Sequence, residues 1–306
     1  MGNLANRPTV VLAALLASGA VLWATPGQQQ VFRSTADVVS MAVTVTGRGD
    51  TLVHGLQRDQ FRVTEDGQPQ TLSYFSTGPS ADVPLHLGLL LDTSGSMQRD
   101  LSAAATAAIR FVNTLEEAKD VTFVDFATEV RVSRYSPSSY PYLFERIREN
   151  SADGYTALYD AVAHYLATAE GQDGLKVLLL YTDGGDSRSE TTFSQLVEML
   201  RLSQVMVYVV GYLDGHLSTE KAMAQMRLND IAHQTGGSSF YPSGKADLDK
   251  IYARILDELA ARYTLGYVST NAKPDGTWRK VEVEVDAPDV RGLKVRTRPG
   301  YFAPIR

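Results

Sequence analysis

The spacing of hydrophobic and polar residues changes twice along the chain. It predicts a parallel sheet in the middle of the chain and antiparallel strands on either side of it. Between about residues 83 and 261, nearly continuous apolar runs are separated by stretches with helical periodicity. A strand without polar positions is buried on both faces, as in a parallel sheet covered by helices. The alternation of strands and helices therefore predicts a doubly wound, mostly parallel, Rossmann-like α/β fold. The strands are expected in LHLGLLLD, VTFVDFA, KVLLLYTD and VMVYVVGY, with EVRVSRY as an antiparallel edge, and the helices over 101–118, 142–148, 157–169, 192–202, 220–234 and 246–262.

The regions before and after this part show the alternating pattern of antiparallel strands. SMAVTVTG and KVEVEVDA each place their valines on one face, and Asp66-Gly67 between two short strand patterns predicts a hairpin. Each region is too short to build a good core of its own. We therefore expect residues 31–80 and 263–306 to pair into one small, discontinuous β-sandwich, into which the α/β domain at 82–262 is inserted.

The N-terminal residues have the pattern of a secretory signal peptide. Arg7 precedes an apolar run from Thr9 to Ala24, and small residues lie near the end of that run. We assign residues 1–25 to the signal; an uncleaved membrane anchor is the alternative, although the run is shorter than the ~20 residues of a spanning helix. The chain has no cysteine, which fits a bacterial periplasm better than a disulfide-rich extracellular setting. We expect an exported protein, periplasmic or extracellular, that contacts the membrane only if the N-terminal segment stays uncleaved.

The composition excludes several classes of function. The net charge is −6, with 29 basic and 35 acidic residues and no basic cluster, so no nucleic-acid partner is expected. The absence of cysteine excludes thiolate catalysis and cysteine-ligated metal sites. The five histidines are scattered along the chain without the spacing of metal ligands.

Side chains that carry oxygen atoms gather where three of the expected strands end, or just beside such an end. In a doubly wound sheet, the carboxyl ends of the strands form the ligand-binding edge. Oxygen ligands suit a hard cation such as Mg²⁺ or Mn²⁺. Each loop taken alone could instead be a helix cap or a turn, and we expect Asp160 and Asp186 to cap helices or support the site rather than bind metal. The candidate metal ligands are Asp92, Ser94, Ser96, Thr156 and Asp183.

The order of these residues resembles the metal-ion-dependent adhesion site of von Willebrand factor type A (VWA) domains. D-x-S-x-S follows an apolar strand, a threonine follows about sixty residues later, and T-D-G follows a further apolar strand. GYTALYDAV and VLLLYTDGGDS are similar to the second and third loops of bacterial members. FRVTEDGQPQTLSYF and YTLGYVST resemble the flanks of a secreted bacterial subfamily of VWA-related proteins described from acidobacteria.

This resemblance implies a role for each candidate ligand. Ser94, Ser96 and Thr156 would bind the metal directly or nearly so, and Asp92 and Asp183 would bind it directly or through water. Tyr155 stands where many relatives have glycine, which leaves the threonine hydroxyl in place and is expected to narrow access to the metal.

The resemblance favours a non-enzymatic binding module over an enzyme. A metal held mostly by neutral hydroxyls keeps part of its charge and favours an anionic ligand, such as an Asp or Glu carboxylate of a partner protein. Mg²⁺ is the expected ion, with Mn²⁺ or Ca²⁺ as alternatives. Two other functions stay open: a structural envelope protein whose metal only stabilises loops, and a metal-dependent hydrolase. The hydrolase is the weaker of these, because the sequence has no G-x-S-x-G, H-E-x-x-H or P-loop motif.

Overall fold

The computed structural model describes residues 38–78, 83–115, 118–214 and 217–305. The predicted signal peptide at 1–25 lies outside these residues. Among the helices in the described ranges, none is both long enough and apolar enough to cross a lipid bilayer.

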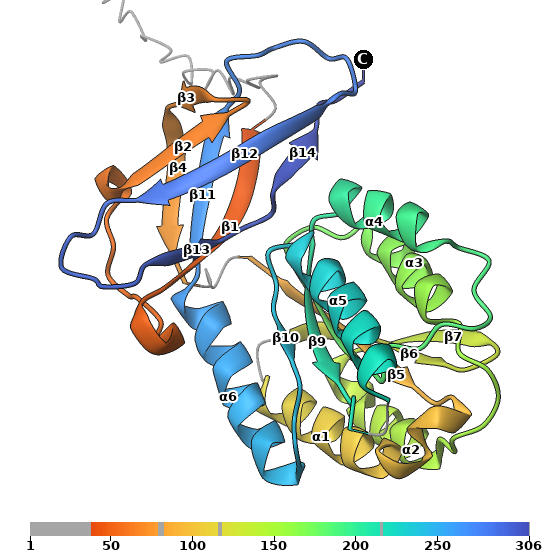
Figure 1. Cartoon of the computed structure of the whole chain (residues 1–306). Helices are drawn as coiled ribbons and strands as arrows, with labels where there is room; N and C mark the ends of the chain where they lie inside the picture. The colour runs from red at the N-terminus through yellow and green to blue at the C-terminus, as the bar shows by residue number, and fades with distance from the viewer. Residues whose placement is uncertain (1–37, 79–82, 116–117, 215–216, 306) are drawn as a thin grey trace, which may run out of the picture. The chain divides into compact units, whose positions relative to one another are not determined.

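The α/β part is built on one six-stranded sheet with the strand order β10-β9-β8-β5-β6-β7 (Figure 1). All neighbouring strands are parallel except β7, which is antiparallel to β6 at the edge. This confirms the predicted fold class and the predicted edge strand. β5, β8 and β9 are buried along almost their whole length, as their continuous apolar runs require. The strands are β5 (Leu85–Asp92), β6 (Ala118–Phe126), β7 (Val130–Tyr135), β8 (Leu175–Thr182), β9 (Val205–Gly211) and β10 (Ser239–Phe240).

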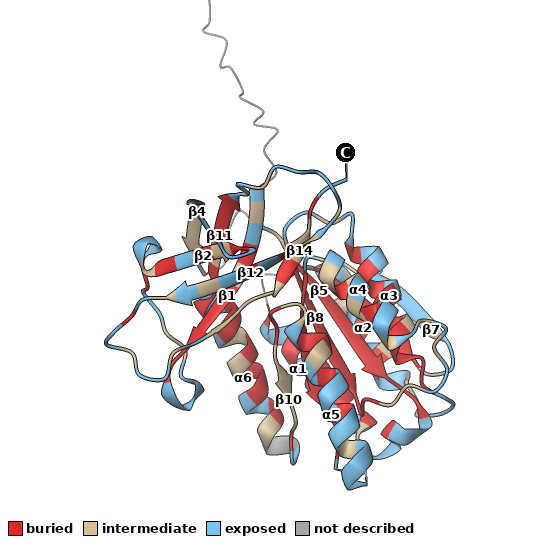
Figure 2. Ribbon diagram, turned by 45° about the horizontal axis from the view of Figure 1, so that its top comes forward, coloured by how far each residue is buried: buried red, intermediate tan, exposed pale blue. Residues whose placement is uncertain are grey.

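Helices cover both faces of this sheet and form two separate hydrophobic cores (Figures 1 and 2). One core contains side chains of α1, α2 and α6, and the other contains those of α3, α4 and α5. Figure 2 shows the strands buried between the helices, whose outer faces are exposed. The helices are α1 (Leu101–Thr114), α2 (Tyr140–Glu149), α3 (Leu158–Ala169), α4 (Phe193–Leu202), α5 (Ser218–His233) and α6 (Lys245–Ala261), with short 3-10 helices η1 (Arg48–Asp50), η2 (Arg58–Gln60), η3 (Gly95–Arg99) and η4 (Pro137–Ser139).

One boundary of the α/β part was predicted wrongly. The helix expected to reach residue 118 ends at Thr114, and β6 begins at Ala118 rather than at Val121. Ala118 is buried and pairs in register with Leu85 of β5. Strand pairing and burial therefore override the helical preference of this alanine.

The strands outside the α/β part form two four-stranded antiparallel sheets, in the orders β13-β1-β11-β4 and β14-β12-β2-β3. In both sheets, strands from the N-terminal region pair with strands from the C-terminal region. Asp66 and Gly67 form the expected hairpin turn, with φ angles of 49° and 79°. The two sheets share one hydrophobic core. The strands are β1 (Val38–Thr46), β2 (Phe61–Glu65), β3 (Gln68–Gln70), β4 (Leu72–Thr77), β11 (Tyr263–Val268), β12 (Trp278–Val285), β13 (Lys294–Arg296) and β14 (Gly300–Phe302).

A buried carboxylate links these two sheets. Glu65 of β2 is 2% exposed, and its carboxylate accepts hydrogen bonds from the hydroxyls of Tyr267 (2.9 Å), Ser269 (2.6 Å) and Tyr301 (2.9 Å). Burial raises the pKa of Tyr301 to about 12, so this hydroxyl stays protonated and donates. Because Tyr267 belongs to the other sheet, these hydrogen bonds fix the register of one sheet against the other.

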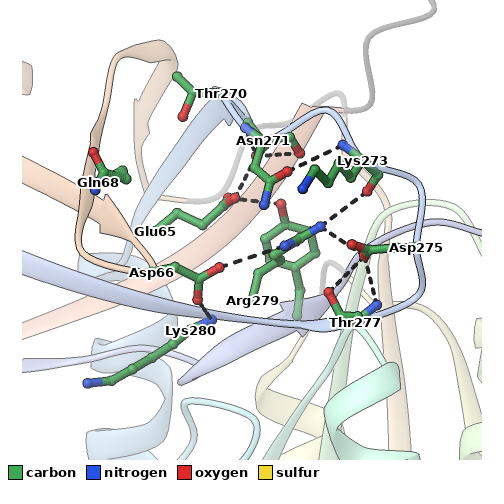
Figure 3. A network of polar contacts seen from close by, with 12 residues as sticks. Glu65, Asp66, Gln68, Thr270, Asn271, Lys273, Asp275, Thr277, Arg279 and Lys280 are labelled. Carbon is green, nitrogen blue, oxygen red and sulfur yellow. Dashed lines mark hydrogen bonds and ion pairs between the residues drawn. The ribbon is translucent and has the colours of Figure 1, made fainter.

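A buried arginine fastens the loop that follows Ser269, as Figure 3 shows. The Nη2 atom of Arg279 donates to the carboxylate of Asp275 (2.9 Å) and to the carbonyl of Lys273 (3.2 Å). Asp275 also accepts hydrogen bonds from the backbone and the hydroxyl of Thr277. A charge-assisted network therefore helps to hold this loop in place.

We predict that Glu65→Gln lowers the free energy of unfolding by about 1–3 kcal/mol. The glutamine amide offers one accepting oxygen where the carboxylate offers two, so one of the three hydroxyl donors faces an amide N–H₂ group in place of an acceptor and must reorient. Urea unfolding measures the change. Glu282→Gln is the matched control, because Glu282 is exposed and pairs only with Lys280 at the surface, where an ion pair contributes about 0–1 kcal/mol. Equal unfolding curves for the two variants would contradict the prediction.

Candidate functional site

The first loop of the candidate site begins at the last residue of β5. Asp92 is fully buried, and its Oδ1 accepts hydrogen bonds from the backbone N–H of Ser94 (3.0 Å) and from the Ser94 hydroxyl (2.6 Å). The Oγ atoms of Ser94 and Ser96 lie 3.1 Å apart. Ser96 is exposed to solvent, whereas Ser94 is buried. The alternate residues of D-x-S-x-S therefore converge on one point, as predicted, and Ser96 lies at its solvent side.

The structure rules out helix capping as the role of Ser94 and Thr156. Ser94 occupies the N-cap position of η3, but its side chain makes no capping hydrogen bond and turns to Asp92 instead. Thr156 lies one residue before Ala157, which is the N-cap residue of α3. Capping therefore does not explain these two hydroxyls.

The second loop contacts the first through the backbone. The N–H of Gly95 donates to the carbonyl of Gly154 (3.1 Å), and the N–H of Asp153 donates to the carbonyl of Thr93 (2.9 Å). Gly154 has a φ of +80°, a conformation in which a residue with a side chain would be strained. These contacts bring buried Thr156 to the same edge of the sheet as Asp92.

The third loop begins at the last residue of β8 and reaches Asp92 through Thr182. The Thr182 hydroxyl donates to Oδ2 of Asp92 (2.7 Å) and accepts a hydrogen bond from the N–H of Gly184 (3.0 Å). Asp183 is buried, and its Oδ1 accepts from the N–H of Gly185 (3.0 Å). Thr182 is the first residue of the T-D-G motif but was not among the predicted ligands, because the sequence does not show that its hydroxyl reaches Asp92.

Asp160 and Asp186 hold the third loop against the start of α3. Oδ1 of Asp186 accepts from the N–H of Tyr159 (3.2 Å), which belongs to the first turn of α3. The carboxylate of Asp160 accepts from the N–H groups of Glu190 and Thr191, both at 2.9 Å. Both carboxylates thus satisfy backbone donors, one of them at a helix N-terminus, which matches the supporting role expected from the sequence.

The electrostatics of the site fit a bound cation. Burial raises the pKa of Asp92 to about 7; the hydrogen bonds from Ser94 and Thr182 oppose this shift, and the negative charge of Asp183 adds to it. Within the described chain, no lysine, arginine or histidine forms an ion pair with Asp92 or Asp183. Buried carboxylates are normally paired with a cation or bound to a metal. The two carboxylates and three hydroxyls predicted as ligands would suit a hard divalent ion.

Apolar side chains are exposed beside these loops. Tyr155, next to Thr156, is 66% exposed, and Leu217 at the start of α5 is 71% exposed. Both lie in loops at the carboxyl edge of the parallel strands. A further loop, at 214–216, follows β9, and its described residue, Asp214, pairs with Lys221 (3.2 Å). Gly215 and His216 lie outside the described residues.

A doubly wound sheet with an oxygen-rich site at its carboxyl edge defines a class of α/β binding domains. The family model of the von Willebrand factor type A domain matches residues 86–254, more than half of the chain. The protein therefore belongs to the von Willebrand factor type A domain family.

Solved structures with this fold are only distantly similar in sequence. A von Willebrand factor type A protein from Catenulispora acidiphila is 15% identical, with a TM-score of 0.47 over 90% of this chain and 75% of that chain. The PilB minor pilin from Streptococcus sanguinis is 14% identical, with a TM-score of 0.46 over 58% of this chain and 61% of the pilin. The chain thus spans about three fifths of the length of this pilin. No curated protein matches the chain.

Proposed function

We propose that this protein is a non-enzymatic binding module that captures an acidic residue of a partner protein through a divalent metal. The observation that carries the proposal is the pair of buried carboxylates, Asp92 and Asp183, which have no counter-cation in the described chain and lie beside convergent hydroxyls. Mg²⁺ is the proposed ion, with Mn²⁺ or Ca²⁺ as alternatives. We place the protein outside the cytoplasm, in the periplasm or beyond, on the basis of residues 1–25. The proposed ligands are Asp92, Ser94, Ser96, Thr156 and Asp183.

The burial of the ligands determines the side from which a partner could reach the metal. Asp92 and Ser94 form the floor of the site, and exposed Ser96 lies at its solvent side. Hydroxyl ligands are neutral and do not reduce the positive charge of the metal. If one of the two proposed carboxylate ligands binds only through water, the charge of the divalent ion is incompletely neutralised. Mg²⁺ usually keeps several waters, and an incoming Asp or Glu carboxylate would replace one of them on this side.

A single metal–carboxylate bond does not make a specific complex, which also needs about 1,600 Å² of total buried surface. Tyr155 and Leu217 offer exposed apolar area beside the site. Aromatic residues are enriched at the cores of protein interfaces. We therefore include both residues in the proposed contact surface.

Two observations disfavour the alternative functions. The loops contact one another through hydrogen bonds of their own, from the N–H of Gly95 to the carbonyl of Gly154 and from Thr182 to Asp92, which disfavours a metal whose only role is to hold them together. In the described chain, the Ser94 hydroxyl bonds to Asp92 and Ser96 and to no histidine, so it lacks the usual general base of a serine hydrolase.

The test is partner capture from an envelope extract, with the wild type and the Asp92→Ala variant, each in Mg²⁺ and in EDTA. Asp249→Ala serves as the matched control, because Asp249 is an exposed carboxylate on α6. Calorimetry with the captured partner should show affinity that falls in EDTA, returns with Mg²⁺, and falls again when one acidic residue of the partner becomes alanine. A partner that binds the Thr156→Ala variant in EDTA as tightly as it binds the wild type in Mg²⁺ would refute the proposal.

We predict that Thr182→Val weakens Mg²⁺ binding about 10–100-fold, the usual effect of removing a group that orients a metal ligand. Valine keeps the shape of threonine but cannot donate to Oδ2 of Asp92. Titration calorimetry with Mg²⁺ measures the change. Thr182→Ser keeps the hydroxyl and should bind within a few-fold of the wild type. Wild-type affinity in the valine variant would show that Thr182 does not orient Asp92.

A further inference from the structure

A cavity lies at the amino ends of the parallel strands, opposite the edge that carries the candidate metal site. It has a volume of about 310 Å³ and is lined on one side by the first residues of β8 and β9, among them Leu175 and Val205. The candidate metal site lies at the other end of the sheet, where β5 and β8 end. The cavity and the metal site therefore share no residue. The other wall of the cavity is the sheet formed by β1, β11 and β4.

Hydroxyl groups lie side by side on this second wall. Thr264 of β11 pairs in register with Ala42 of β1 and with Ser76 of β4. Ser40 also lines the cavity from β1. Because side chains on adjacent strands at the same register share one face, the Thr264 and Ser76 hydroxyls point to the same side of the sheet. The wall therefore offers neutral hydrogen-bonding groups, and two arginines, Arg262 and Arg298, line the same cavity.

Arg262 brings a buried and unneutralised positive charge to this cavity. It is the single residue between α6 and β11, it lines the cavity, and it is only 6% exposed. Within the described ranges, its Nε and Nη1 atoms have no hydrogen-bond partner and no carboxylate forms an ion pair with it. A buried guanidinium without a partner is strongly unfavourable, because it has lost its hydration.

Two other arginines that are largely shielded from solvent each have a carboxylate partner, unlike Arg262. Arg279 is equally buried and pairs with Asp275. Arg296 pairs with the buried carboxylate of Glu258. Both follow the rule that buried charges are paired. Arg262 departs from it and faces a cavity.

A second arginine lines the same cavity. Arg298 donates from Nε to the carbonyl of Gly300 (2.7 Å) and from Nη2 to the carbonyl of Arg201 (3.1 Å). Carbonyl groups orient the Arg298 guanidinium but do not neutralise its charge. No acidic residue is among the described residues that line this cavity. The described part of the cavity thus combines two cations with hydroxyls and contains no anion.

We propose that this cavity binds a small oxyanion, a carboxylate or phosphate group, between Arg262 and Arg298. The planar guanidinium group is suited to both, because its N–H donors match the spacing of two oxygen atoms. Such an anion would contact the β1-β11-β4 sheet and the start of β8 and β9 at once. Its binding would therefore stabilise the chain where α6 passes into β11. The proposal does not depend on the metal site.

The experiment titrates the full-length protein, in EDTA, with inorganic phosphate and separately with malonate. Calorimetry and thermal unfolding should show saturable binding of at least one anion and a rise in melting temperature. Arg262→Met should weaken that binding about tenfold or more, since it removes one charge-assisted partner. Arg110→Met is the matched control, because Arg110 is exposed and pairs only with Asp249, and it should bind as the wild type does.

A second variant tests the cavity if Arg262→Met fails to fold. Gln204 lines the cavity and is exposed, so Gln204→Glu adds a negative charge without disturbing the core and should also weaken anion binding. Preference for phosphate or for malonate identifies the chemical group. Two results would overturn the proposal: no saturable binding of either anion, or unchanged affinity in both variants.

Discussion

Replacing both Ser94 and Ser96 by alanine is expected to abolish the stabilisation of the protein by Mg²⁺. A ligand that binds only the folded state adds about 2.7 kcal/mol to the free energy of unfolding at one hundred times its Kd. The double variant loses two of the three proposed hydroxyl ligands. Its metal-free form should still fold, because Asp92 keeps its hydrogen bonds to the Ser94 N–H and to Thr182. Scanning calorimetry in Mg²⁺ and in EDTA measures the effect.

The chain offers a closely matched control for this experiment. Ser136 and Ser138 are also two residues apart, with Oγ atoms 2.9 Å apart, but they are exposed and lie away from the three loops. Ser136→Ala with Ser138→Ala should leave the response to Mg²⁺ unchanged. If the Ser94 and Ser96 double variant kept the full response, these serines would not be metal ligands.

Deleting residues 263–306 is expected to unfold the N-terminal strands while the α/β part stays folded. β1 and β4 do not pair with each other, because β11 lies between them, and β2 pairs with β12 on its other side. Without the C-terminal strands, β2 and β3 remain as one two-stranded hairpin, which is at best marginally stable in water. The deletion also removes Tyr263, Leu265 and Tyr267 from the shared core.

Amide hydrogen exchange checks this expectation strand by strand. In a chain that ends at residue 262, amides of 38–77 should exchange at the rates of an unfolded peptide. Amides of β5 and β8, which pair with each other and lie in the two α/β cores, should stay protected. Protected amides in both regions would show that the N-terminal strands fold independently, and the predicted division at 31–80, 82–262 and 263–306 would then be wrong.

Much of the fold could be predicted from the sequence, because its longest patterns each favoured one kind of element. Apolar runs such as KVLLLYTD fit only a strand that is buried on both faces, and Asp66-Gly67 fits a tight hairpin. The start of β6 at Ala118 could not be predicted, because alanine favours a helix and only its pairing with Leu85 makes it a strand residue. β10 is two residues long, and a segment so short carries no periodicity.

The candidate site was predicted from three loops, and the first of them has the strongest local pattern. The spacing of Asp92, Ser94 and Ser96 implies convergence, and the structure brings these three side chains into hydrogen-bond contact. Thr182 contacts Asp92 from ninety residues away; the T-D-G motif marks its position in the chain, but the sequence does not show the contact. The unpaired charge of Arg262 is likewise a property of its surroundings and not of the sequence.

The pairing of distant strands has a consequence for the order of events during synthesis. The N–H of Leu56 donates to the hydroxyl of Tyr263, a residue 207 positions later. At about 5–20 residues per second, the early strands wait roughly 10–40 s for their partners. The α/β part, whose neighbouring strands are closer in sequence, can fold within that interval, whereas β1 and β2 keep open edges. Open strand edges are where nascent chains associate with one another, so we expect a chaperone that binds extended apolar segments to act on residues 38–77.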